Sequence, residues 1–126
     1  MIQGSFGQHL MSRRTAFRLF ALLFFAAAAY HLLAVMAPTI GILGPRWRHA
    51  LFVAVDIAFA GLLLQRPPWL VVPFTILTIQ ALYSHGTHAW KWWHLEHHVD
   101  WLSLGVIVAL PIMLIVVIQD WRERRS

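Results

Sequence analysis

The sequence has no cysteine in its 126 residues. This absence excludes structural disulfides, cysteine-ligated zinc, iron–sulfur clusters and thiol catalysis. Charged residues are also scarce, at 12% of the chain, which is about half the usual share. No internal repeat, low-complexity tract, nucleophile motif or phosphate-binding loop is evident. The last two absences favour a protein that is not an enzyme.

Hydrophobic residues, in contrast, make up 60% of the chain, and the mean hydropathy is +0.65. A soluble domain of this size could not bury so much apolar surface, because small domains keep a large fraction of their surface exposed. The apolar residues fall in four segments, at 15–36, 49–65, 69–83 and 101–119. A membrane-spanning helix needs about 20 apolar residues. The sequence therefore predicts an all-α membrane protein, a four-helix transmembrane bundle with short loops.

The third apolar segment is shorter than the other three. It reaches a spanning length only if its helix continues past Tyr83 into the stretch that contains His85. The residues from Thr87 to Val99 contain no proline. We therefore expect this stretch to form a short helix at the membrane interface before the fourth span.

The basic residues predict the orientation of the bundle. In a four-span arrangement, seven arginines lie on one side: Arg13, Arg14, Arg18, Arg66, Arg122, Arg124 and Arg125. Arg46, Arg48 and Lys91 lie on the other side. Cytoplasmic loops of membrane proteins carry an excess of Lys and Arg. We therefore expect the protein to lie in a bacterial inner membrane with both termini on the cytoplasmic side. The net charge of +5 then reflects topology and contact with anionic lipid, and no nucleic-acid partner is expected.

These boundaries divide the chain into three parts. Residues 1–14 are predicted to form a cytoplasmic tail, in which residues 1–10 are a poorly ordered extension. Residues 15–119 form the four-span domain, and residues 120–126 form a basic cytoplasmic tail. The expected partners are the lipid bilayer and other membrane subunits.

One segment of eighteen residues, SHGTHAWKWWHLEHHVDW, contains five of the eight histidines and four of the seven tryptophans. It runs from Ser84 to Trp101. Tryptophan favours the membrane interface, because its ring is apolar while its N–H needs a polar partner. The orientation above places this segment on the outer side of the membrane.

The histidine spacing in this segment predicts a transition-metal site. On a helix, His94 and His98 share one face, as two ligands of one metal ion require. The predicted metal ligands are His85, His88, His94, His97, His98, His49 and Glu96. Nitrogen and oxygen donors suit copper, zinc or iron. A proton-sensing role and a plain interfacial loop are the alternatives.

A second feature is Asp56, in the middle of the second apolar segment. A charge at the bilayer centre costs roughly 2.5–3.5 kcal/mol on insertion scales, so ionisable residues there are candidates for function. We expect Asp56 to face the interior of the bundle and to belong to an intramembrane polar site. The predicted members are Asp56, Gln80, His31, Tyr30 and Tyr83. Such a site could carry protons, hold a polar head group or support a metal at the surface.

Three functions are compatible with this sequence. The first is a metal-binding membrane protein that stores, senses or delivers a transition metal, or assists assembly. The second is a non-catalytic accessory subunit of a larger membrane complex. The third is a membrane enzyme that acts on a lipid or quinone, with Asp56 and a histidine as acid and base. A haem b held by His31 and either His49 or His85 is the less favoured cofactor.

Overall fold

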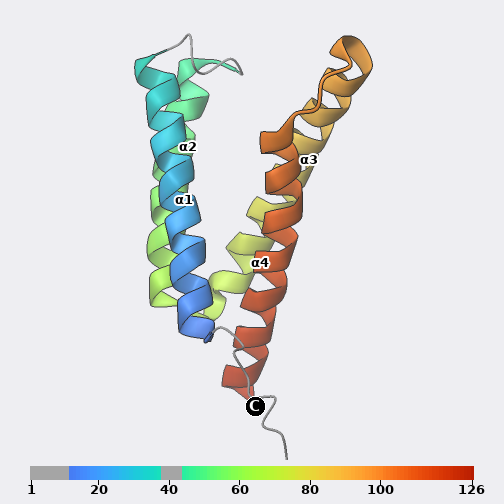
Figure 1. Cartoon of the computed structure of the whole chain (residues 1–126). Coiled ribbons are helices and arrows are strands. Elements are labelled where there is room, and N and C mark those ends of the chain that lie inside the picture. Colours follow the sequence, from blue (N-terminus) through green and yellow to red (C-terminus); the bar gives the residue numbers. More distant parts are fainter. Residues whose placement is uncertain (1–11, 38–43) are drawn as a thin grey trace, which may run out of the picture. The chain divides into compact units, whose positions relative to one another are not determined.

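The computed structural model describes residues 12–37 and 44–126 of the chain. These residues form four α-helices and one short 3₁₀ helix, and no strand occurs among them. The all-α prediction is therefore confirmed (Figure 1). The chain divides into two compact units, Met1–Leu64 and Gln65–Ser126. The predicted disorder of residues 1–10 concerns residues outside the described ranges.

The first unit contains helices α1 (Arg13–Met36) and α2 (Arg46–Gln65). The hydroxyl of Ser12 caps α1 by accepting a hydrogen bond from the backbone N–H of Thr15, which satisfies one of the free donors of the first turn. The buried residues of α2 are His49, Asp56, Ala60 and Leu63. Their spacing of seven, four and three places the two polar residues on the same face as the two apolar ones.

Helices α1 and α2 lie side by side and run in opposite directions (Figure 1). Ring contacts join them, between Phe24 and Phe59 and between His31 and both His49 and Phe52. The buried face of α2 therefore meets α1, and Asp56 points into the unit, as predicted.

The second unit contains the 3₁₀ helix η1 (Pro68–Leu70) and helices α3 (Val71–Glu96) and α4 (Trp101–Arg125). Helices α3 and α4 form an antiparallel pair (Figure 1). The buried residues of α4 are Ser103, Leu110, Met113, Val117 and Asp120. Their spacing alternates between three and four, apart from one gap of seven, and so marks a single stripe along α4.

Helix α3 continues through the histidine-rich segment, as a spanning length requires. A separate interfacial helix does not form, because α3 is unbroken through Gly86 and ends only at Glu96. Helix α4 extends beyond position 119, through the basic residues, to Arg125.

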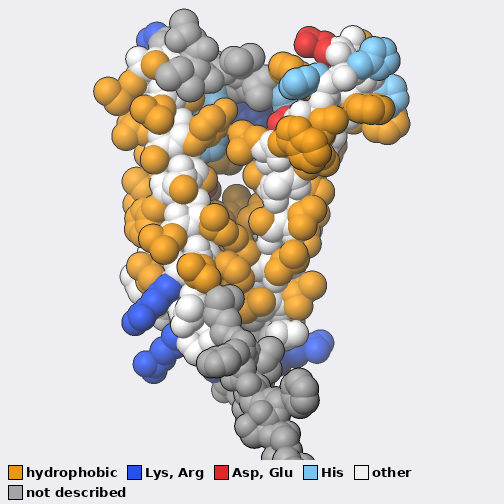
Figure 2. Space-filling view, viewed as in Figure 1, with side chains coloured by type: hydrophobic (Ala, Val, Ile, Leu, Met, Phe, Trp, Pro, Cys, Tyr) orange, Lys and Arg blue, Asp and Glu red, His pale blue; other side chains and the backbone are white. Residues whose placement is uncertain are grey.

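Among the described residues, three helices are long and apolar enough to cross a membrane: α1, α2 and α4. Helix α3 is not among them, because its second half carries histidine, lysine and tryptophan in place of aliphatic residues. Most side chains in the three apolar helices face outward, and hydrophobic groups cover the length of each unit (Figure 2). These features support a membrane protein.

Candidate functional site

The first unit holds a cluster of three ionisable side chains, His31, His49 and Asp56, which we call the His–His–Asp cluster. The Nδ1 atoms of His31 and His49 lie 2.9 Å apart. The other ring nitrogen of His31, Nε2, lies 3.8 Å from Oδ2 of Asp56. His31 therefore stands between the other two residues and uses a different nitrogen toward each.

Two of the three side chains are almost completely buried. His49 is 5% exposed and Asp56 is 6% exposed. Nε2 of His49 and Oδ2 of Asp56 are buried without a hydrogen-bond partner among the described residues. Buried polar atoms in this condition are uncommon and require an explanation, of which a catalytic role is one.

Aromatic rings fix the orientation of His31. The ring of Phe52 stacks on it at 5.2 Å, and Tyr30 meets it edge-on at 5.4 Å. Tyr30 is a predicted member of this site, whereas Phe52 is not. Phe52 lies three residues after His49, close to one helical turn, and this spacing is the signal that could have identified it.

The short contact between the two imidazoles restricts their protonation. When both rings are neutral, only one of the two Nδ1 atoms can carry a hydrogen, and the other must accept it. If His49 donates, His31 carries its own hydrogen on Nε2, facing Asp56. If His31 donates, its Nε2 has a free lone pair facing Asp56. The tautomer of His31 therefore decides whether a hydrogen or a lone pair faces Asp56 at 3.8 Å.

The separation of His49 and Asp56 along α2 gives the length of the His–His–Asp cluster. His49 and Asp56 are seven residues apart on the same face of α2, which corresponds to about 10 Å along a helix. His49 lies in the first turn of α2 and Asp56 near its middle. The cluster thus connects the end of an apolar helix to its centre.

The second unit holds a separate polar network at the junction of α3 and α4. Nδ1 of His85 lies 3.0 Å from Oγ of Ser103, and the Ser103 hydroxyl donates a hydrogen bond of 2.5 Å to Oδ2 of Asp100. Because that hydroxyl has only one hydrogen, His85 must be the donor in its own contact with Ser103. Nε2 of His88 lies 3.6 Å from the same carboxylate oxygen.

Asp100 also caps α4, because its Oδ1 accepts the backbone N–H of Ser103 at 3.1 Å. Burial raises the pKa of Asp100, but the two hydrogen bonds from Ser103 and the charges of His88 and His85 outweigh it. The pKa of Asp100 therefore lies below its ordinary value. Asp100 directly before an apolar run is a helix-start signal, so this cap was detectable in the sequence.

The histidines at the end of α3 have other arrangements. His94 stacks on Trp90 at 3.9 Å, and its Nδ1 lies 3.1 Å from the Trp90 carbonyl oxygen. His97 ends the helix in a left-handed conformation, with φ of 50°. His98 follows that end and contacts the ring of Trp92. His94 and His98 thus do not share one continuous helical face.

The predicted metal ligands therefore fall in different places. His49 lies in the His–His–Asp cluster, His85 and His88 lie in the α3–α4 network, and His94, His97, His98 and Glu96 lie exposed at the end of α3. Within the described ranges, no group of three or more histidine, cysteine, aspartate and glutamate residues could hold a metal ion. The transition-metal and haem functions stay predictions.

The other predicted members of the intramembrane site lie on α3. Gln80 and Tyr83 both have exposed side chains, and they belong to the second unit. The structure thus brings together His31, Tyr30 and Asp56 from that set, and adds His49 from the predicted metal ligands.

Comparison with protein-family models, curated proteins and solved structures gives no match for this chain.

Proposed function

We propose that this chain is a four-span membrane protein that transfers protons through the His–His–Asp cluster. The observation that carries the proposal is the geometry of His31, whose Nδ1 lies 2.9 Å from His49 and whose Nε2 faces Asp56 at 3.8 Å. An imidazole that accepts a proton on one nitrogen and releases one from the other is the usual unit of a proton relay.

The transfer can be written as a balanced sequence. At the start, His49 carries its hydrogen on Nδ1, His31 carries its hydrogen on Nε2, and Asp56 is ionised. A proton that arrives at Nε2 of His49 releases the Nδ1 proton to His31, and His31 releases its Nε2 proton to Asp56. One proton enters and one is delivered, and both imidazoles finish neutral in the opposite tautomer.

The distance between His31 and Asp56 must shorten for the second transfer. A contact of 3.8 Å exceeds hydrogen-bond length, and catalytic contacts are often longer at rest than during proton transfer. Rotation of the carboxylate or one bridging water closes this gap. The stacked ring of Phe52 keeps His31 in position while this happens.

The proposed topology supplies a direction. If both termini lie on the cytoplasmic side of a bacterial inner membrane, His49 lies near the outer surface of the membrane and Asp56 near its midplane. Helix α3 crosses with α4 as its antiparallel partner. A proton would then move between the outer surface and the membrane interior, where a lipid-soluble substrate such as a quinone, or a partner subunit, receives it.

The test is time-resolved infrared spectroscopy of the full chain in lipid after a pH jump. We expect a carboxylic-acid band that Asp56→Asn removes. We expect His49→Leu to slow the rise of that band about a hundredfold, as relays of this kind contribute. His94→Leu, which removes an exposed histidine of α3, is the matched control and should leave the rate unchanged. An equal rate in His49→Leu would refute the relay.

A metal ion shared by the two Nδ1 atoms is the competing explanation for their short contact. The described residues provide no third ligand of the usual types for it. Metal analysis of the untagged protein decides between the proton relay and a shared metal ion. About one equivalent of copper, zinc or iron, lost in both His31→Ala and His49→Ala, would replace the proton proposal with a metal site.

A further inference from the structure

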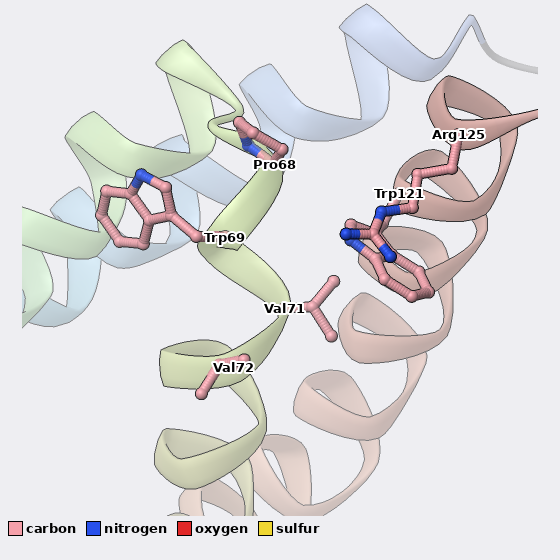
Figure 3. Close-up of a pocket in the computed structure, with 6 residues that line it drawn as sticks. All are labelled: Pro68, Trp69, Val71, Val72, Trp121 and Arg125. Atoms are coloured by element: carbon pink, nitrogen blue, oxygen red, sulfur yellow. The ribbon is translucent and has the colours of Figure 1, made fainter.

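We propose that the second unit binds the head group of an anionic phospholipid in a hollow. This hollow lies at the end of the unit that is farther from the histidines of α3. The hollow has a volume of about 370 Å³, within the range of small-molecule sites. It is formed where η1 and the first turn of α3 face the last turns of α4. Its lining residues are Pro68, Trp69, Val71, Val72, Trp121 and Arg125 (Figure 3).

Arg125 is the positively charged residue that lines this hollow. Its guanidinium carbon lies 4.6 Å from the centre of the Trp121 ring, and the two side chains stack on each other (Figure 3). Stacking occupies the flat face of a guanidinium and leaves the N–H groups on its edge free for a phosphate. Trp121 therefore holds Arg125 ready for an anion.

The acidic residue next to Trp121, Asp120, is already paired. Asp120 is 7% exposed and forms ion pairs with both Arg66 and Arg124. Arg124 also donates a hydrogen bond of 2.8 Å to the Arg66 carbonyl oxygen. Among the described side chains, no carboxylate pairs with Arg125 in an ion pair of 4.0 Å or less. The hollow thus retains a positive charge that an anionic ligand can neutralise.

The rest of the lining is apolar and open. Trp69 is 57% exposed and Val72 is 64% exposed, while Val71 points toward Trp121 across the hollow (Figure 3). Exposed tryptophan and aliphatic side chains suit the upper part of an acyl chain. A soluble anion would gain nothing from them, so charge and lining together select an amphiphile.

The position in the fold agrees with this ligand. Helix α4 is apolar enough to cross a membrane, and Trp121 and Arg125 lie in its last two turns. Tryptophan and arginine at the end of a span lie at the level of the lipid head groups. Basic pockets between helices at that level are typical sites for anionic lipids. This inference does not depend on the proton relay.

Native mass spectrometry of the full chain in mild detergent tests the proposal. We expect wild-type protein to retain one phosphatidylglycerol in preference to phosphatidylcholine. Arg125→Gln should weaken retention tenfold or more, since a hydrogen bond to a charged group contributes at least that much. Arg122→Gln removes the same charge from the same helix end without changing the hollow, and it should reduce retention no more than about twofold.

Three results would overturn the proposal. Equal losses in Arg122→Gln and Arg125→Gln would mean attraction by diffuse surface charge only. Equal retention of phosphatidylcholine would mean an acyl-chain contact without head-group recognition. Displacement of the lipid by soluble glycerol phosphate would mean a site for free phosphate. Trp121→Leu gives a second check, because it should weaken retention while leaving the charge unchanged.

Discussion

The acidic side chains differ chiefly in what surrounds them. The chain has five acidic residues, and three of them carry polar networks. Asp120 is enclosed by two arginines, and Asp100 by a serine and a histidine. Within the part of the chain that the structure describes, Asp56 has only His31 at ion-pair distance. The least compensated carboxylate thus lies deepest in an apolar helix, which is why we assign function to Asp56 and structure to the other two.

Asp120→Asn tests the structural role of the arginine pairs. We expect the free energy of unfolding to fall by about 1.5–3 kcal/mol, because hydrogen bonds to charged groups contribute that much. Thermal unfolding in mild detergent, followed by circular dichroism, measures the effect. Glu96→Gln, at an exposed position, is the control and should change stability by less than about 0.5 kcal/mol. Equal effects in both variants would contradict the assigned role.

At the scale of the element, α3 has two halves of different character. Its first half buries Phe74, Thr78 and Ala81, whereas its second half carries the histidines and tryptophans. The second half is connected to α4 by His85 and His88, which reach Ser103 and Asp100. The first turn of α4 thus anchors the polar half of α3.

Asp100→Asn tests this anchor through its pH dependence. Because the pKa of Asp100 lies below its ordinary value, its stabilising effect is present above about pH 4 and is lost as the pH falls through the lowered pKa. We expect the free energy of unfolding to be about 1 kcal/mol higher in wild type than in the variant near neutral pH, because hydrogen bonds to a charged group are stronger than those to a neutral one.

The measurement compares the thermal unfolding midpoints of wild type and Asp100→Asn from pH 7 downward. The difference should shrink below about pH 4. A difference that stays constant over the whole range would show that the carboxylate charge does not stabilise the junction.

At the scale of the whole molecule, the outward side chains decide the environment. Large hydrophobic residues remain exposed along α1, α2 and α4, among them Leu22, Val108 and Ile115. Soluble monomers rarely expose such continuous apolar surface. Lys and Arg side chains, in contrast, lie towards the two ends of the visible face (Figure 2). A lipid bilayer around the helices accounts for both the exposed apolar surface and the position of the basic side chains.

The absence of cysteine makes the topology directly testable. We expect Glu96→Cys to react with a membrane-impermeant maleimide in intact cells. We expect Gln65→Cys and Ser126→Cys to react only after the membrane is permeabilised. Because these positions flank α3 and α4, the pattern reports both crossings. Labelling of Gln65→Cys in intact cells would contradict the four-span topology.

Local patterns in the sequence were enough to predict the helical class, the apolar segments and the burial of Asp56. These properties depend on local hydrophobic period and on the cost of burying a charge. The sequence also indicated that the third helix must extend into the histidine-rich segment. The tertiary structure alone decided which histidines meet. His31 and His49 lie eighteen residues apart, and only the packing of α1 on α2 brings their rings together, whereas the close sequence spacing of His94 and His98 is undone by the helix end at Glu96.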